Sequence, residues 1–345
     1  MNNFTQNEKN IGEKTIVNTA VIGAGGWGTA MAKLLCENGH NVSLWVRTQK
    51  KCDEIKNAGE NKEYLPGVKL ESSINFTADL ACIKNCKYIF IATPSKAIRE
   101  ICKKINRTAN DGSIIVILSK GFENDTLCTM SDVAKQCLPK AKICVMSGPS
   151  HAEEVARGIP TLNVVASNDE SICKAVQNIC MNEYFRVYTS SDMLGVELGG
   201  ALKNVIALCA GIIDGIGFGD NTKAALMTRG IKEIARLGVK MGANGDTFWG
   251  LSGIGDLIVT CTSMHSRNRR AGILIGKGLS VDETLKTVHM VVEGIQNAKA
   301  AYELSLKYNT QMPIIHQAYK VLYENKNPKD AVMDLMVRNK KDENM

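Results

Sequence analysis

Short apolar blocks, separated by polar stretches, dominate the first half of the chain. They lie at residues 15–22, 42–47, 88–92, 113–118 and 142–146, with two more at 162–166 and 184–187. Blocks of this length predict buried β-strands, and the stretches between them, such as residues 29–38, predict helices. Strands that alternate with helices indicate an α/β fold with a mostly parallel, doubly wound sheet.

The pattern changes near residue 192, where strand-like blocks give way to helical periodicity. Leu194, Leu198, Leu202 and Ile206 recur every four residues, as on one face of a long helix over residues 194–213. A chain of 345 residues is long enough for two domains. We therefore expect an N-terminal α/β domain at residues 15–190 and a mostly α-helical, substrate-binding domain at residues 191–338.

Composition and charge argue against several classes of protein. The hydrophobic share of 44% and the charged share of 22% are ordinary for a soluble globular protein. The formal net charge of +7 is spread along the chain without a run of five like charges, which argues against nucleic acid as a partner. Residues 1–14 lack the apolar centre of a signal peptide, and no long uninterrupted apolar stretch predicts a membrane span.

The 12 cysteines form neither a C-x-x-C pair nor a Cys/His set at zinc spacing, so we expect no metal site. Several of them, such as Cys144 and Cys209, fall inside apolar stretches. We interpret them as reduced core residues of a cytoplasmic protein.

A glycine-rich turn joins the first expected strand to the first expected helix, with the sequence Gly23-Ala24-Gly25-Gly26-Trp27-Gly28. In this context Gly23 would permit a tight turn, and Gly25 would let the backbone approach a pyrophosphate. Gly28 would let the helix pack closely on the strand. The helix N-terminus adds N–H groups and a positive dipole. The turn therefore predicts a Rossmann-type, dinucleotide-binding domain.

The residue at the end of the second expected strand bears on the choice of cofactor. NAD-specific sites usually place Asp or Glu there to bind the ribose 2′-OH, whereas this chain has Arg47. An arginine can pair with the 2′-phosphate of NADPH. We therefore expect NADPH to be favoured over NADH, with use of both left open.

Loops at the carboxyl ends of parallel strands should meet at one crevice, and here they bring Lys120, Gly148 and Ser150 together.

Lys203 lies within the apolar stretch 194–213, close after Gly199 and Gly200. Glycines weaken a helix, so their presence suggests the close approach of a ligand or another backbone. A buried lysine near a second cation has a lowered pKa and can exchange a proton near neutral pH.

A carboxylate and a basic cluster follow in the second half. Asp256 lies in the glycine-rich segment 253–257, and Ser266-Arg267-Asn268 come shortly after it. Arg can bind a phosphate through two hydrogen bonds, and Asn and Ser add neutral ones. We interpret the adjacent arginines at 269 and 270 as solvated residues at the start of a helix.

Taken together, these motifs resemble those of bacterial-type NAD(P)-dependent glycerol-3-phosphate dehydrogenases. The matching segments are GAGGWGTA, LWVR, SKGFE, GPSHAEEV, ELGGALKNVIALCAGI, GLSGIGDLIVTCTS, SRNRRAG and VVEG. By this resemblance, the substrate contacts fall on Lys120, Gly148, Ser150, Lys203, Asp256, Ser266, Arg267 and Asn268. The cofactor contacts fall on Gly26, Trp27, Arg47, Lys120, Ala152, Arg267, Val291 and Glu293. Some members carry Ser-Phe or Ser-Tyr in place of Gly26-Trp27, which bears on the cofactor and not on the chemistry.

The resemblance implies hydride transfer between NADH or NADPH and dihydroxyacetone phosphate, giving sn-glycerol 3-phosphate for phospholipid synthesis. Lys203 matches the family's proton-transferring lysine, and Lys120 and Asp256 are the other catalytic candidates. Asp256 positions either Lys203 or a substrate hydroxyl. A homodimer is left open.

Two other functions also stay open. A β-hydroxyacid dehydrogenase would have no need of the phosphate cluster at residues 266–268. A non-catalytic NADPH sensor would have no reason to keep Lys120 and Lys203 together.

Overall fold

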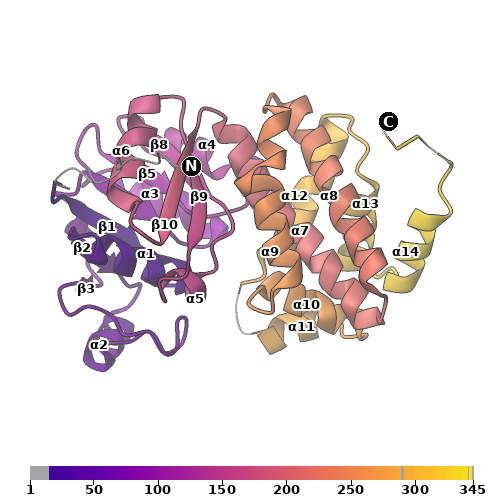
Figure 1. Ribbon diagram of the computed structural model, residues 1–345, viewed down its shortest axis with the longest axis horizontal. Coiled ribbons are helices and arrows are strands. Elements are labelled where there is room, and N and C mark those ends of the chain that lie inside the picture. The colour runs from indigo at the N-terminus through magenta and orange to yellow at the C-terminus, as the bar shows by residue number, and fades with distance from the viewer. Residues whose placement is uncertain (1–14, 289–290, 341, 344–345) are drawn as a thin grey trace, which may run out of the picture.

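The computed structural model describes residues 15–288, 291–340 and 342–343, and it shows an α/β part beside a helical part (Figure 1). The main sheet consists of β1 (Asn18–Ile22), β2 (Asn41–Trp45), β3 (Asn75–Thr77), β4 (Tyr88–Ile91), β5 (Ile114–Ile117), β8 (Lys142–Ser147), β9 (Thr161–Ala166) and β10 (Phe185–Ser190). A small hairpin pairs β6 (Phe122–Glu123) with β7 (Cys128–Thr129). The helices of this part are α1 (Gly26–Glu37), α2 (Gln49–Ala58), α3 (Ile98–Ile105), α4 (Met130–Cys137), α5 (Ala152–Val155) and α6 (Glu170–Cys180).

The sheet is mostly parallel, as the alternating pattern predicts. Its strand order is β10-β9-β8-β5-β4-β1-β2-β3. Strands β3, β2, β1, β4, β5 and β8 are parallel to one another, β9 is antiparallel to β8, and β10 is parallel to β9. The carboxyl ends of β1, β4, β5 and β8 therefore share one edge, where the predicted loops follow.

Several element boundaries differ by one to three residues from the sequence-based expectation. Strand β1 begins at Asn18, and α1 begins at Gly26 directly after the extended backbone of Gly25. Strand β10 runs to Ser190, past the apolar block that predicts it. Because β10 is an edge strand with alternating buried and exposed residues, its polar second half does not stand out in the sequence.

Helices cover both faces of the sheet. Val21 of β1 packs on the face that α1 and α6 cover, whereas Ala20 and Ile22 pack on the face that α3 and α4 cover. This alternation follows from the two-residue period of a strand, which sends successive side chains to opposite faces. Both faces are buried, so the central strands read as continuous apolar blocks.

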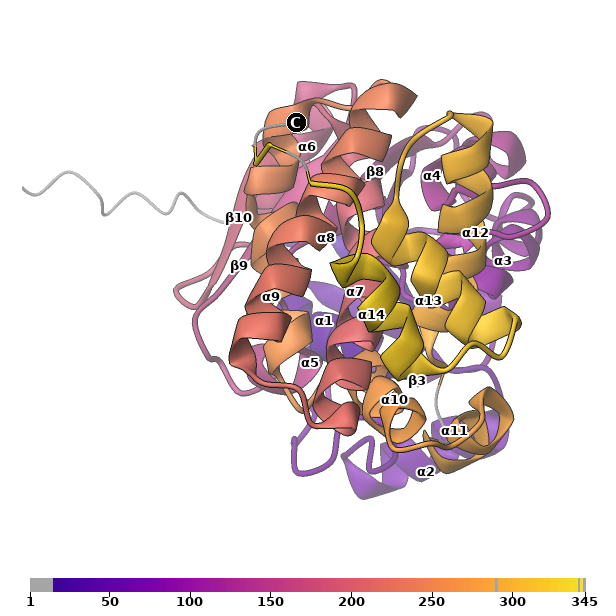
Figure 2. The same cartoon turned by 90° about the vertical axis from the view of Figure 1, so that its right-hand side faces the viewer.

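The helical part is built around α7 (Met193–Ile216). The other helices are α8 (Asp220–Met241), α9 (Asp256–Thr262), α10 (Arg267–Gly276), α11 (Val281–Val288), α12 (Glu293–Lys307), α13 (Pro313–Tyr323) and α14 (Pro328–Met336). Helices α8, α9, α10 and α12 pack against α7 (Figure 2). Among the described residues, α7 alone has the length and apolarity of a membrane span, but 89% of its apolar window is buried in the protein. We therefore interpret α7 as the central core helix of the helical part.

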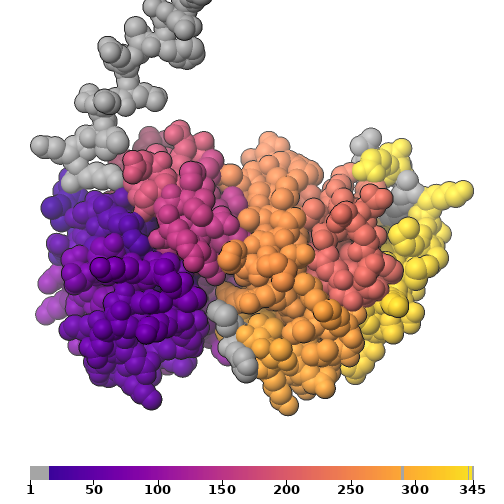
Figure 3. Space-filling model, turned by 60° about the horizontal axis from the view of Figure 1, so that its bottom comes forward, coloured from indigo at the N-terminus to yellow at the C-terminus, as the bar shows by residue number. Residues whose placement is uncertain are grey.

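The change from strands to helices falls between Ser190 and Met193, and the two parts lie in contact (Figure 3). The first turn of α7 contributes Met193 and Val196 to the core beneath the sheet. The rest of α7 forms the core of the helical part. This single helix thus carries residues from the carboxyl edge of the sheet into the helical part.

Candidate active site

A carboxylate held between two ammonium groups forms the centre of the site. Asp256, at the first turn of α9, accepts hydrogen bonds from Lys203 of α7 at 2.6 Å and from Lys120 at 2.5 Å. Lys120 follows β5 in the α/β part, so this bridge joins the two parts of the molecule. The structure therefore brings together the three residues that the sequence proposes as catalytic.

Burial controls the charges of this cluster. Asp256 is 1% exposed and Lys203 is 6% exposed. Burial lowers the pKa of Lys203 to about 8; the Asp256 carboxylate opposes this effect and the Lys120 ammonium adds to it. Burial acts to raise the pKa of Asp256, but the two ammonium groups outweigh it and hold that pKa below its usual value.

Lys203 has one further partner that sets its direction. Its ammonium donates to the Thr260 hydroxyl at 2.6 Å, and that hydroxyl donates to the Asp256 backbone carbonyl at 2.6 Å. An ammonium group has three protons, so two are used by Asp256 and Thr260. The third has no partner among the described residues and is available to a substrate oxygen.

Two glycines let α7 approach the site closely. A Cβ on Gly199 would lie 2.6 Å from the Ser252 carbonyl oxygen, and a Cβ on Gly200 would lie 2.6 Å from the Ser147 hydroxyl. Any side chain there would push α7 away from the segment before α9 and from the end of β8. The sequence suggests that these glycines allow a ligand or another backbone to come close. In the structure it is the protein's own atoms that come close to α7, and this packing brings Lys203 to Asp256.

The loop after β8 lies against Lys120. The Gly148 carbonyl accepts hydrogen bonds from Lys120 at 3.4 Å and from the Ser150 hydroxyl at 3.0 Å. Asn163 of β9 donates to the same hydroxyl at 3.2 Å. Gly148 has a φ of +157°, and a Cβ there would lie 2.7 Å from the Asn163 side chain. Glycine is needed at this position to keep the loop close to Lys120.

The predicted phosphate cluster forms the start of α10. Ser266 is the N-cap, and its hydroxyl accepts from the Arg269 amide at 3.2 Å. The Asn268 amide group donates to Asn204 at 2.9 Å and accepts from the Gly294 N–H at 2.8 Å. Arg267 is exposed at the first helical position, whereas Arg269 makes an ion pair with Asp214 at 2.8 Å.

Arg269 thus forms an ion pair with a carboxylate of the protein. The expectation that Arg269 is solvated is therefore wrong. The reason is that α10 packs against α7, which carries Asp214. Arg267 and Arg270 are both exposed, so only the expectation for Arg269 is wrong.

The glycine turn has the geometry that its sequence predicts. Gly23 has a φ of +115°, a conformation that favours glycine, and a Cβ on Gly28 would lie 1.9 Å from the Gly23 carbonyl oxygen. A Cβ on Gly25 would meet nothing within 4 Å. The turn is therefore tight, the helix is close to the strand, and open space lies where the backbone should meet a pyrophosphate.

Around this turn lie the residues predicted to contact the cofactor. A Cβ on Gly26 would lie 2.8 Å from the Tyr64 carbonyl oxygen and 3.5 Å from Ala152 Cβ. Trp27 is partly buried and its ring lies 6.4 Å from that of Phe185. Gly26 and Ala152 are thus brought together. The Trp27 ring packs toward the core of the α/β part.

Arg47 lies just past the end of β2 and is exposed, within electrostatic range of Tyr64. On the other side of the turn, Glu293 at the start of α12 accepts from the Ser95 N–H at 3.2 Å and from the Ser95 hydroxyl at 2.7 Å. Burial raises the pKa of Glu293, and the Ser95 hydrogen bonds oppose this effect. The Glu293 carboxylate is close enough to the Arg267 guanidinium to interact with its charge. Val291, two residues before Glu293, is half-buried.

Comparison with known proteins assigns the family. The family model for the N-terminus of NAD-dependent glycerol-3-phosphate dehydrogenase matches residues 18–173. The family model for the C-terminus of the same enzyme matches residues 192–333. The chain belongs to this family. The family predicted from the motifs is thus confirmed.

Individual relatives agree with this assignment. A glycerol-3-phosphate dehydrogenase of Fusobacterium nucleatum, named as using NAD(P)+, is 54% identical over 329 residues, which cover 94% of this chain and 98% of the relative. One from Thermoanaerobacter is 53% identical over 325 residues, covering 94% and 98%. The crystal structure of glycerol-3-phosphate dehydrogenase from Coxiella burnetii is 35% identical, with a TM-score of 0.90 over 94% of this chain and 99% of that one.

Several residues of this family member join the site although the sequence does not single them out. Thr260 positions Lys203, Asn204 holds Asn268, and Ser95 holds Glu293. Only Thr260 carries a signal in the sequence, because it lies four residues after Asp256 and therefore on the same face of α9. Asn204 and Ser95 act through tertiary contacts that have no local pattern.

Proposed function

We propose that the protein catalyses the NAD(P)-dependent interconversion of dihydroxyacetone phosphate and sn-glycerol 3-phosphate, and so supplies glycerol 3-phosphate for phospholipid synthesis. The observation that carries the proposal is the buried Asp256 carboxylate between Lys203 and Lys120. A carbonyl reduction needs a proton donor at the oxygen and positive charge to stabilise the alkoxide as it develops. The two lysines supply both.

In this mechanism Lys203 is the general acid for reduction. Its remaining N–H would donate to the C2 oxygen, and with a pKa of about 8 the ammonium can release a proton near neutral pH. The Lys120 ammonium would add positive charge beside the same oxygen. Asp256 and Thr260 hold Lys203 in place, and in the reverse direction neutral Lys203 accepts the proton from the alcohol.

The phosphate of the substrate would lie at the start of α10. Arg267 is exposed there and offers two parallel N–H donors. Ser266 uses its oxygen as the N-cap acceptor, which leaves its hydroxyl proton for a phosphate oxygen. Asn268 has one N–H left after its bond to Asn204, and the backbone N–H groups of the first helical turn add to the anion site.

A dinucleotide fits the turn after β1. The open space at Gly25 and the uncapped N–H groups of α1 suit a pyrophosphate. Arg47 would hold the adenosine end, Gly26, Trp27 and Ala152 would line the middle, and Glu293 and Val291 would lie toward the nicotinamide. When bound, the nicotinamide supplies the hydride. The loop at residues 148–152 runs from Lys120 to Gly26, so it would link the cofactor to the reacting centre.

Several broader features belong to the same proposal. Residues 15–190 act as the dinucleotide-binding domain and residues 191–338 as the substrate-binding domain. The protein works in the cytoplasm on a small molecule. A homodimer remains a prediction that sedimentation analysis tests.

One assay tests the function. The purified protein is mixed with NADH or NADPH and one of three substrates: dihydroxyacetone phosphate, dihydroxyacetone or a β-keto acid. We expect nicotinamide absorbance to fall rapidly only with the phosphate ester. Equal or faster turnover of the keto acid would favour a β-hydroxyacid dehydrogenase, and tight NADPH binding without any turnover would favour a sensor.

A further inference from the structure

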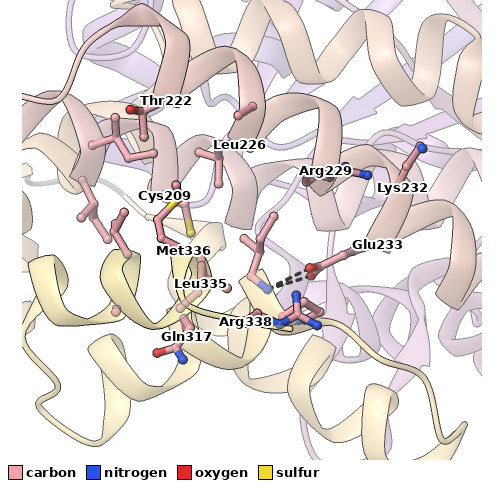
Figure 4. A pocket seen from close by; sticks show the side chains of 18 of the residues that line it. Cys209, Thr222, Leu226, Arg229, Lys232, Glu233, Gln317, Leu335, Met336 and Arg338 are labelled. Carbon is pink, nitrogen blue, oxygen red and sulfur yellow. Dashed lines mark hydrogen bonds between the residues drawn. The ribbon is translucent and has the colours of Figure 1, made fainter. Parts of the chain in front are cut away.

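A cavity with apolar walls lies in the helical part, among α7, α8, α13 and α14 (Figure 4). Its volume is about 460 Å³, which is in the range of small-molecule sites. Its apolar walls include Ile212, Ile213, Leu226, Val321 and Leu335. None of the residues that we assign to substrate or cofactor lines it.

The mouth of this cavity is basic. Arg229, Lys232 and Arg236 on α8 line it together with Arg338, which follows α14. Figure 4 shows Arg338 beside Glu233, and Arg229 and Lys232 on the helix that also carries Glu233 and Leu226. The combination of an apolar interior and several cations at one end suits a ligand with an anionic head and an aliphatic chain.

Two acidic residues, Glu233 and Asp342, also line the cavity. The Glu233 carboxylate accepts from the N–H groups of Ile314 at 2.8 Å and Ile315 at 3.2 Å, at the start of α13. Its charge is therefore directed to a helix N-terminus, where it is stabilised by the helix dipole. The lining still holds more cations than acids, because Arg229, Lys232, Arg236 and Arg338 stand against Glu233 and Asp342.

The protein already shows which anion these cations accept. The Glu343 carboxylate makes an ion pair with Arg229, and it contacts Lys232 at 3.2 Å. The Arg229 and Glu343 side chains are 47% and 64% exposed, so water and salt screen this pair. A carboxylate that also buries an aliphatic chain gains hydrophobic contacts that Glu343 lacks.

We propose that this cavity binds a fatty carboxylate, whose head group replaces Glu343 on Arg229 and Lys232 and whose chain lies against Ile212, Ile213 and Leu226. The site goes beyond the proposed catalytic function and shares no residue with it. Cys209, which also lines the cavity, lies six residues after Lys203 on α7, about 9 Å along the helix axis. The bound chain would therefore contact the helix that carries the proposed acid.

The test measures binding of radiolabelled decanoate to the full-length protein by equilibrium dialysis, below the micellar concentration. We expect one saturable site per chain. Unlabelled decanoate should compete at least tenfold better than decanol, which has the same chain without the charge. The double variant Arg229→Gln/Lys232→Gln should weaken decanoate binding at least tenfold, whereas Lys240→Gln, an exposed lysine of α8 outside the cavity, should not.

A second pair of variants tests the cavity itself. Ala225 is exposed and lines the cavity, whereas its neighbour Ala224 is exposed and does not. Ala225→Trp should abolish binding, and Ala224→Trp should leave it unchanged. Circular dichroism and turnover of dihydroxyacetone phosphate confirm that each variant folds.

Three results would overturn the proposal. They are absence of saturable binding to the wild-type protein, equal competition by decanol, and equal loss of binding in both members of either variant pair. A change of oligomeric state with Ala225→Trp but not Ala224→Trp would instead assign this face to a second copy of the chain. Because the readout is binding and not activity, failure here would leave the proposed catalytic function untouched.

Discussion

Replacing Asp256 with asparagine separates the two roles that this carboxylate could have in the proposed mechanism. Asn keeps the shape of the side chain but removes the charge that stabilises both ammonium groups. A hydrogen bond to a charged group contributes about 1.5–3 kcal/mol, and about 1.4 kcal/mol corresponds to one pKa unit. From its present value of about 8, the pKa of Lys203 should therefore fall to about 6–7 in Asp256→Asn.

The pH dependence of glycerol 3-phosphate oxidation reports this pKa. Oxidation needs neutral Lys203 as the base, so kcat/KM should rise with pH and level off above the pKa of Lys203 in the free enzyme. The midpoint of this rise should lie near pH 8 in the wild type and near pH 6–7 in the variant. Reduction of dihydroxyacetone phosphate needs the ammonium form, so at pH 7.5 the variant should lose reduction rate.

A matched control is available on α7. Asp214 also lies between two cations, Lys223 at 2.5 Å and Arg269 at 2.8 Å, but outside the site. Asp214→Asn should leave the midpoint unchanged. If Asp256→Asn lowers turnover but keeps the midpoint near that of the wild type, Asp256 does not set the charge of Lys203. A contact with a substrate hydroxyl would then be the better account.

Three further substitutions test other parts of the site. Lys203→Ala should fold normally by circular dichroism and lose turnover by roughly 100-fold or more, as for loss of a general acid; near-normal turnover would remove Lys203 from the mechanism. Arg267→Ala should raise KM for dihydroxyacetone phosphate far more than for dihydroxyacetone, and equal effects would show that Arg267 is not mainly a phosphate ligand. Arg47→Asp should shift the ratio of kcat/KM for NADPH over NADH about tenfold toward NADH, because about 1.4 kcal/mol of phosphate pairing is lost; an unchanged ratio would mean that Arg47 does not bind the 2′-phosphate.

The sequence predicts the sheet well because its central strands are buried on both faces. β4 and β5 stand out as continuous apolar blocks for this reason. The direction of β9 has no such signal, since an antiparallel strand can have the same apolar pattern as a parallel one. Strand direction is decided by the path of the connections, which a local pattern does not contain.

Some parts of the candidate site can likewise be predicted from the sequence, and others cannot. The glycine turn is predictable because its backbone geometry depends on residues that are adjacent in the sequence. The bridge from Lys120 through Asp256 to Lys203 is not, because its members come from three elements and meet only after folding. Sequence reasoning finds Lys203 through the contrast with its apolar neighbours, but it leaves the partner of Asp256 undecided.

In the proposed mechanism, the contact with Asp256 cannot by itself decide which lysine transfers the proton. Asp256 offers one oxygen to each lysine, at nearly equal distances. The two lysines differ in burial, because 8% of the Lys203 side chain is exposed and 22% of the Lys120 side chain is exposed. Burial penalises the charged form, so Lys203 gains more by releasing a proton, while the Lys120 ammonium is better hydrated. From this difference in burial we expect Lys203 to transfer the proton and Lys120 to supply the positive charge that faces the developing alkoxide.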